Sequence, residues 1–409
     1  MTIYSGGYNS LTGQVGLVCY LKGTKILTDH GPVAVEDLRE GDSVVCRFGG
    51  LRPIRWIGRQ QFAGPRAAGR EAIRFAPGSI GNGMPQEDLF VSPGHSMLVG
   101  ETLVLASTLV NGLSITRETP RDEWSYFQLD LGDHGLVLAN GTWSESFADC
   151  GDFRSMFDNV AEFRERFPDH CAPDTPALCA ERPAGGVKLH AALDVTARRA
   201  LALQQPVAPG RLEGRIEAVA AACHVTGWAM DADHPGRPVL LEVVLDDEVI
   251  GETCACGPRP GARDQGRMGF VFDGRRRLSA DELLRLVVRR KQDGQVLAPV
   301  TSTPAGPLHG HLDLITDTGR LSGWARDKAD PQRPVMLEVV LGDEVLGAVL
   351  ACRPRTDLEK AGLGDVAFVF DANRTLASEE IGALYLRRAG DGARLKQSEG
   401  TKFAPSKVA

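Results

Sequence analysis

The C-terminal half of the chain contains one sequence pattern twice. Residues 213–303 and residues 308–400 each carry a Gly-Trp-Ala motif, an alternating run that ends in LEVVL, and a closing FVFD. The tryptophans of the motif, Trp228 and Trp324, lie 96 residues apart, too long a period for a solenoid repeat. Alternating apolar runs separated by turn residues are typical of β-sandwich modules. We therefore predict two tandem β-sandwich modules, with both tryptophans in their cores rather than on a sugar-stacking surface.

The preceding part of the chain also predicts short strands. Residues 19–153 contain apolar runs such as KILT, DSVVC, RPIRWIG and TLVLAS, separated by Gly, Pro, Asn and Asp. This spacing is typical of an all-β domain and does not fit a βαβ fold. Residues 154–212 differ, because FDNVAEFRERF and DVTARRALALQ have helical spacing and the segments between them are rich in proline. We expect a mainly β fold in which residues 154–212 form a short helical connector with exposed linkers.

Composition limits the partners and the location of the protein. The 409-residue chain has a formal net charge of -7, which argues against a broad surface for nucleic acid or anionic membranes. No apolar run reaches the roughly 18–20 residues of a spanning helix, and the first residues lack the pattern of a signal peptide. Nine scattered cysteines suit reduced thiols better than a disulfide framework. We expect no membrane span and no nucleic-acid partner, in a protein that is cytoplasmic or secreted without a Sec signal.

A cysteine, a serine and a histidine are the candidates for chemistry in the first β region. Cys19 follows the apolar run GLV, and the sequence SPGH places Ser92 three residues before His95. Taken singly, they are explained by a buried thiol, a turn residue and a core histidine. A cysteine can also attack the carbonyl of the preceding residue, here Val18, which moves the acyl group from nitrogen to sulfur and leaves a thioester. His95 can then protonate the departing amine, because an imidazole ordinarily titrates near neutral pH.

Three sequence blocks occur in a specific order around these residues. They are CYLKGTKILTDHGPVAVEDLREGDSVV, DLFVSPGHSMLV and YFQLDLGDHGLVLANG. Together they resemble the Hint superfamily, the self-processing domain shared by hedgehog proteins and inteins, and look most like its bacterial hedgehog/intein branch. The resemblance covers residues 19–153 and implies a Hint-type β fold. It also implies that Ser92 holds the scissile peptide and that His134, in the third block, is a further site residue.

The resemblance implies a single-turnover, autocatalytic cleavage rather than a turnover enzyme. Cys19 is then the nucleophile, His95 is the proton donor, and water or a small nucleophile resolves the thioester. The substrate is the chain's own N-terminal leader, residues 1–18, and no external cofactor is needed. Inteins end in a His-Asn pair followed by Cys, Ser or Thr, whereas the corresponding stretch here is TWSESFADCG. We therefore expect cleavage at the Val18–Cys19 bond without splicing.

Two features favour an alternative hypothesis. Gln128 occupies a position where inteins often carry Asp, so a carboxylate role passes to Asp130 or Asp133, or is absent. Residues 1–18 are also a small cargo for a domain of this kind. The alternative is a catalytically silent Hint domain in a binding or surface-associated protein, in which residues 213–400 bind a glycan or a protein partner. The two modules resemble β-sandwich repeats found beside bacterial glycosyltransferases and in surface proteins.

The remaining polar motifs predict ordinary roles. Cys254 and Cys256 lie in a strand-like run, and His309 and His311 lie in what the sequence indicates is a linker. Neither pair has a second pair at zinc spacing, so we expect no structural metal. The basic run Arg289–Lys291 is expected to be solvated, because acidic residues nearby balance its charge.

Overall fold

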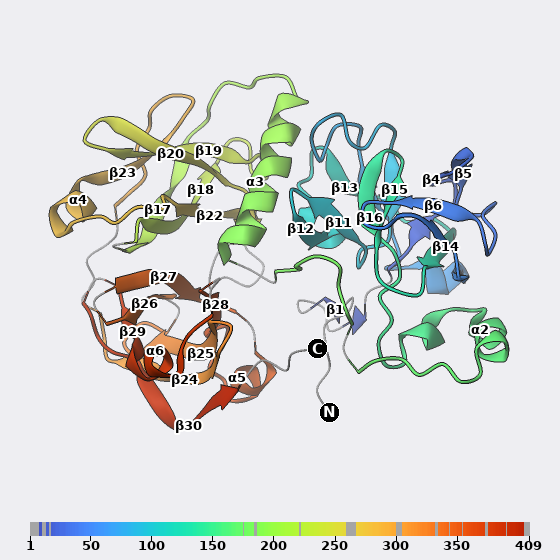
Figure 1. Cartoon of the computed structure of the whole chain (residues 1–409). Coiled ribbons are helices and arrows are strands. Elements are labelled where there is room, and N and C mark those ends of the chain that lie inside the picture. Colours follow the sequence, from blue (N-terminus) through green and yellow to red (C-terminus); the bar gives the residue numbers. More distant parts are fainter. Residues whose placement is uncertain are drawn as a thin grey trace. The chain divides into compact units, whose positions relative to one another are not determined.

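The structure is a computed structural model in which the chain forms two compact units (Figure 1). The first unit comprises residues 1–184 and 191–206, and the second comprises residues 185–190 and 207–409. Strands dominate both units, which confirms the predicted mainly β fold class. None of the described helices is long and apolar enough to cross a membrane. The structure describes residues 8–404 except 10–13, 16–17, 175, 184–185, 221, 259–266, 300–304, 332–333, 343, 354, 373–374 and 390.

The first unit is built mainly from short antiparallel strands. These are β3 (Tyr20–Leu21), β4 (Lys25–Thr28), β5 (Gly31–Ala34), β6 (Ser43–Cys46), β7 (Gly50–Pro53), β8 (Trp56–Ala63), β9 (Ile73–Phe75), β10 (Leu89–Val91), β11 (Ser96–Val99), β12 (Thr102–Leu105), β13 (Ile115–Arg117), β14 (Glu123–Asp130), β15 (Leu136–Ala139) and β16 (Thr142–Glu145). One sheet has the order β13-β9-β10-β3-β14-β8. The other has the order β12-β11-β16-β15-β4-β6-β7, and β5 pairs with β4. The predicted runs KILT and SVVC are strands β4 and β6.

The predicted leader is described only in part. Strands β1 (Tyr8–Asn9) and β2 (Gln14–Val15) form an antiparallel pair. Val18 is described and is half-buried. The other leader residues lie outside the described part of the chain.

A long strand pair carries the aromatic core of the first unit. β14 pairs with β8 along its whole length. Alternate residues of a strand point to the same face, so β14 buries Trp124 and Tyr126, whose stacked rings have centroids 6.3 Å apart. Trp56 and Cys19 belong to the same buried cluster. Burying each large apolar side chain contributes about 1.5–3 kcal/mol, so the residue predicted as the nucleophile lies within a stabilising core of the domain.

Short helices complete the first unit, and the predicted connector packs closely against its strands. Arg154 is buried, and its Nη2 atom lies 2.8 Å from a carboxylate oxygen of Asp130 and 3.0 Å from one of Asp149. Its guanidinium carbon lies 3.8 Å from the ring centroid of Phe163, which places a cation over an aromatic face. These helices are η1 (Gly64–Ala67), α1 (Ala106–Leu109), η2 (Phe153–Met156) and α2 (Val160–Arg166). The longer helix α3 (Gly186–Ala202) has residues in both units. Helix α3 begins earlier than the sequence DVTARRALALQ predicts.

The second unit contains two similar arrangements of strands. The first has sheets β17-β18-β22-β21 and β20-β19-β23, and the second has sheets β28-β25-β24-β30 and β27-β26-β29. All of these pairs are antiparallel except β24 with β30. The elements of the first copy are β17 (Leu212–Ala220), β18 (His224–Asp231), β19 (Val239–Leu245), β20 (Glu248–Ala255), β21 (Gly257–Pro258), β22 (Arg267–Asp273), α4 (Ala280–Arg285) and β23 (Leu286–Arg290). Those of the second copy are β24 (Leu308–Thr316), β25 (Arg320–Asp327), β26 (Val335–Leu341), β27 (Glu344–Ala351), α5 (Thr356–Lys360), β28 (Ala367–Asp371), α6 (Ser378–Ala383), β29 (Leu384–Arg388) and β30 (Lys396–Ala404).

Each copy has its own apolar core. Phe270 on β22 and Phe368 on β28 occupy matching places, and both are buried among the alternating residues of the neighbouring strands. Trp324 is buried beside Leu358, in agreement with a packing role, whereas Trp228 is half-buried. Two separate cores fit the sequence argument that each module packs by itself.

The His309–His311 pair lies in a strand and not in a linker. Both residues belong to β24, and each ring makes an edge contact with Trp324, at centroid distances of 4.9 Å and 5.6 Å. The sequence-based expectation of a linker was wrong, because the chain on both sides of Gly310 continues as one strand. At that glycine, an added Cβ would lie 2.1 Å from the backbone oxygen of Trp324, so the close approach of β25 requires a residue without a side chain.

Each module contains a buried arginine near its last strand. The expectation that the whole run Arg289–Lys291 is solvated was therefore wrong. The side chain of Arg290, the last residue of β23, is only 4% exposed and lies 3.4 Å from Asp231. It also donates to the carbonyl oxygen of Gly210 at 2.8 Å. In the second module, Arg388 makes the corresponding contacts with Asp327 and Gly306, at 3.1 Å and 2.8 Å. The alternation of β23 turns Arg290 inward while its neighbours face outward, and charge composition alone does not reveal this.

Replacing Arg290 with Ala is expected to lower the free energy of unfolding of the second unit by about 3–5 kcal/mol, because the buried carboxylate of Asp231 loses its cation. Denaturant unfolding of the full chain measures this change. Arg285→Ala is the control, since its side chain is 51% exposed and an exposed ion pair contributes less than about 1 kcal/mol. Equal midpoints for the two variants would contradict a stabilising role for the buried pair.

Candidate active site

Two hydrogen bonds join Cys19 to Ser92, one accepted by the serine side chain and one between the two backbones. The N–H of Cys19 donates to Oγ of Ser92 at 2.8 Å, and the N–H of Ser92 donates to the carbonyl oxygen of Cys19 at 2.8 Å. Ser92 follows β10, which pairs with β3 through Val91 and Tyr20, so the backbone bond from Ser92 to Cys19 extends the ladder between the two strands. The serine hydroxyl therefore contacts the nitrogen of the Val18–Cys19 peptide, which is the bond that the sequence predicts to be cleaved.

The thiol of Cys19 is completely buried. It donates to Oε1 of Gln60 at 3.6 Å, and Gln60 in turn donates through Nε2 to the carbonyl oxygen of Met156 at 2.5 Å. Removal from water raises the pKa of the Cys19 thiol, and a hydrogen bond from the Val18 backbone opposes this only in part. The resting thiol is therefore protonated at neutral pH.

His95 lies on the same turn as Ser92. Its backbone N–H donates to the carbonyl oxygen of Ser92 at 3.1 Å, and its ring packs against Tyr20 with centroids 4.5 Å apart. The side chain is completely buried, and neither ring nitrogen has a hydrogen-bond partner among the described residues. Burial lowers the pKa of His95 to about 4, with nearby Glu145 acting in the opposite direction. The expectation that this imidazole titrates near neutral pH was therefore wrong, and the resting ring is neutral.

His134 contacts a carboxylate and a backbone amide. Its Nε2 atom lies 3.2 Å from Oε2 of Glu145, and its Nδ1 atom accepts from the N–H of Cys179 at 3.1 Å. An imidazolium has no lone pair on Nδ1 for the Cys179 amide, so the neutral ring with its proton on Nε2 satisfies both contacts. In the described part of the chain, Ser92 contacts Cys19 and His134 does not.

Glu145 and Arg182 belong to this buried group, and the sequence did not point to them. Glu145, at the end of β16, is completely buried and accepts from the N–H of Ser96 at 2.6 Å and from Nη2 of Arg182 at 2.5 Å. Burial alone would raise the pKa of Glu145, but the Arg182 charge and the His134 hydrogen bond lower it to about 2. A single glutamate in TWSES carries no signal for a partner 37 residues away.

The carboxylates that the sequence offered in place of Gln128 are engaged elsewhere. Asp130 pairs with Arg154 and accepts from the N–H of Gly132 at 2.8 Å. Asp133 has a side chain that is 98% exposed and lies 3.8 Å from Arg52. Gln128 itself is buried on β14, and neither atom of its amide group has a partner among the described residues. The buried carboxylate that acts electrostatically on His95 is therefore Glu145.

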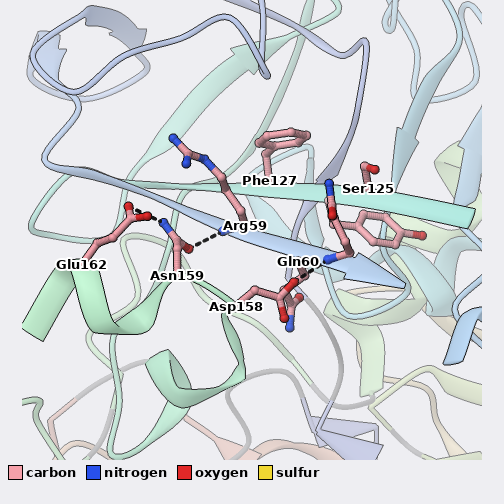
Figure 2. A pocket seen from close by; sticks show the side chains of 9 residues that line it. Arg59, Gln60, Ser125, Phe127, Asp158, Asn159 and Glu162 are labelled. Carbon is pink, nitrogen blue, oxygen red and sulfur yellow. Dashed lines mark hydrogen bonds between the residues drawn. The ribbon is translucent and has the colours of Figure 1, made fainter. Parts of the chain in front are cut away.

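A surface cavity of about 290 Å³ lies next to Gln60 (Figure 2). In the figure, residues of β8 and β14 form one side of it and residues from the start of α2 form the other. Because Gln60 also accepts the hydrogen of the thiol, one side chain separates the cavity from Cys19. The lining residues are Arg59, Gln60, Gln61, Ser125, Tyr126, Phe127, Asp158, Asn159 and Glu162.

The comparisons with known proteins identify the domain that carries this site. A family model of the Hint domain matches residues 18–151. This stretch of the chain is a Hint domain of the hedgehog/intein type, as the three sequence blocks predicted. A comparison with curated proteins found no match.

Several solved structures are similar to a part of the chain. One is an intein-like domain from Clostridium thermocellum, with 17% identity over 32% of this chain and 99% of that one, and a TM-score of 0.23. A variant of the gp41-1 intein has 14% identity over 32% of this chain and 98% of that one, with a TM-score of 0.23. A variant of the MchDnaB-1 intein has 14% identity over 31% of this chain and 99% of that one, with a TM-score of 0.23.

Proposed function

We propose that this Hint domain cleaves its own chain at the Val18–Cys19 bond through a thioester. The observation that supports the proposal is that Ser92 contacts the nitrogen of this bond and lies on the same turn as His95. Ser92 Oγ accepts from that nitrogen at 2.8 Å, and the buried ring of His95 keeps both nitrogens unpartnered among the described residues. An unpartnered buried polar group is unfavourable for stability, so its retention supports a chemical role.

The first step transfers the acyl group from nitrogen to sulfur. The neutral ring of His95 takes the proton from the Cys19 thiol while Sγ attacks the carbonyl carbon of Val18. The carbon–nitrogen bond then breaks, and the nitrogen of Cys19 receives the proton from the imidazolium. The products are a thioester between Val18 and Sγ and a free amine on Cys19, with all atoms and protons accounted for. General acid–base catalysis of this kind contributes about 10²–10⁴-fold.

The lowered pKa of His95 and the raised pKa of the Cys19 thiol determine how proton transfer is timed relative to attack on the Val18 carbonyl. A free thiolate is scarcely populated in the buried site, so proton transfer and attack on the carbonyl must occur together. The thiol must also leave Oε1 of Gln60, to which it donates at 3.6 Å. Rotation about the Cα–Cβ bond of Cys19 moves the thiol away from Gln60, because it carries the side chain from one staggered rotamer to another.

In the second step, water or a small nucleophile attacks the thioester and releases the segment that ends at Val18. The cavity beside Gln60 is the route that we propose for this nucleophile, because it lies one side chain from the thiol. The chain lacks a His-Asn pair after Asn140. Without an asparagine to cyclise there, the reaction ends in cleavage and not in splicing.

Hydroxylamine is expected to trap the thioester. It attacks the thioester carbonyl, so the purified chain should yield a fragment ending at Val18 with a hydroxamate and a second fragment beginning at Cys19. Mass spectrometry of both fragments identifies the bond that was broken. The matched control is Cys46→Ala, which removes another buried thiol of the same domain and should not prevent trapping. A chain that stays intact under these conditions would contradict the proposed reaction.

A silent Hint domain is the competing proposal. The buried, protonated thiol and the neutral Gln128 favour it. In that case the chain retains its full mass in hydroxylamine, and residues 213–400 provide the function by binding a glycan or a protein partner. Glycan arrays and pull-downs with the full chain test this second candidate.

A further inference from the structure

The connector contacts the Hint domain at the buried polar residues His134 and Glu145. Residues 179–182, which we call the connector strap, lie beyond the matched family region of residues 18–151. Cys179 and Ala180 pack against an apolar cluster that contains Leu98, Leu103 and Leu136. The carbonyl oxygen of Glu181 accepts from the N–H of Leu103 at 2.8 Å. The strap is therefore docked on the domain, whereas the proline-rich sequence predicted an exposed linker.

Two polar contacts extend from the strap into the site. The N–H of Cys179 donates to Nδ1 of His134 at 3.1 Å, and Nη2 of Arg182 lies 2.5 Å from Oε2 of Glu145. The side chain of Arg182 is only 11% exposed and that of Glu145 only 1%. This ion pair is thus shielded from water, where removal of one partner leaves the other charge uncompensated.

A hydrogen bond to the backbone links Glu145 to the residue that follows His95. The Oε1 atom of Glu145 accepts from the N–H of Ser96 at 2.6 Å, and Ser96 directly follows His95. Glu145 raises the pKa of His95 and Arg182 lowers it. The strap thus supplies the Arg182 charge directly, pairs with the Glu145 charge, and donates to the neutral ring of His134 through the Cys179 amide.

We propose that the connector strap is part of the active site and that Arg182 is a positioning residue, which holds Glu145 ionised against the Ser96 amide and thereby fixes His95. This inference rests on the proposed function for its effect on cleavage. Its structural part, the link from Arg182 to Ser96, stands independently. Loss of the cation protonates or displaces the buried carboxylate of Glu145, and the turn that holds His95 loses its anchor.

Amide hydrogen exchange of Ser96 tests the link without relying on cleavage. The experiment uses the full chain carrying Cys19→Ala, so that the polypeptide stays intact. Arg182→Met is expected to increase exchange at Ser96 by about tenfold or more, because it weakens a charge-assisted hydrogen bond. Arg182→Lys keeps a cation and should restore most of the protection. Arg164→Met makes the same charge change on the exposed surface of α2 and should have no effect.

Cleavage rates provide the second readout. With the native Cys19, Arg182→Met is expected to slow cleavage by about 10- to 100-fold. Unchanged exchange at Ser96, or an equal increase at all amides of the first unit, would overturn the inference. Local exchange at Ser96 in a chain that never cleaves would instead uphold the strap and reject the proposed function.

Discussion

Replacing Cys19 with Ala is expected to abolish release of the N-terminal segment. Alanine has no atom that can accept the Val18 acyl group, so the thioester cannot form and only uncatalysed hydrolysis of the peptide bond remains. The domain should still fold, because the change removes one buried sulfur atom and costs about 1 kcal/mol. Intact mass after incubation at neutral pH measures release, and thermal unfolding checks the fold.

Cys46→Ala separates the role of this thiol from a general effect of losing a buried cysteine. Cys46 lies on β6 and is also buried, but it makes no contact with the Val18–Cys19 bond in the described structure. Its variant should release the segment at the native rate. Release by the Cys19→Ala variant would assign the nucleophile to another group and contradict the mechanism.

Replacing His95 with Gln is expected to slow cleavage by about 10²–10⁴-fold, the usual contribution of general acid–base catalysis. Glutamine is polar and of similar length but cannot shuttle a proton. Because the pKa of His95 is lowered to about 4, the native ring is neutral above that pH and can accept the thiol proton. The native rate should therefore persist at mildly acidic pH and fall as the pH drops through about 4, when the ring becomes charged. Single-turnover rates from pH 3 to 8, read by intact mass, measure both effects.

His134→Gln is the matched control for this assignment. His134 is the other buried histidine of the site, but its two ring nitrogens contact Glu145 and Cys179. We expect a smaller loss of rate, which arises through the position of Glu145. If His134→Gln lost the rate while His95→Gln kept it, the roles of the two histidines would be reversed.

The sequence predicted those parts of the domain that depend on local patterns. Short alternating runs indicated the strands, and the mainly β fold is confirmed. Three ordered blocks indicated the Hint domain, which the family match over residues 18–151 confirms. The spacing of Ser92 and His95 reflects one tight turn, so the sequence could place them together. Their roles in catalysis stay predictions.

Contacts between distant segments could not be predicted from one sequence. The pairing of Glu145 with Arg182 depends on how the connector packs, and the same is true of the contact between the Cys19 thiol and Gln60. Burial of Arg290 depends on the strand face that it occupies, which a run of basic residues conceals. The lowered pKa of His95 likewise follows from burial in the folded domain.

The central claim is that the Cys19 thiol breaks the bond that precedes it. The most direct test is the intact mass of the freshly purified native chain and of Cys19→Ala, each incubated with and without dithiothreitol. We predict that only the native chain yields a product that begins at Cys19, and that dithiothreitol accelerates its formation by attacking the thioester. Full-length mass for both proteins under both conditions would contradict the claim.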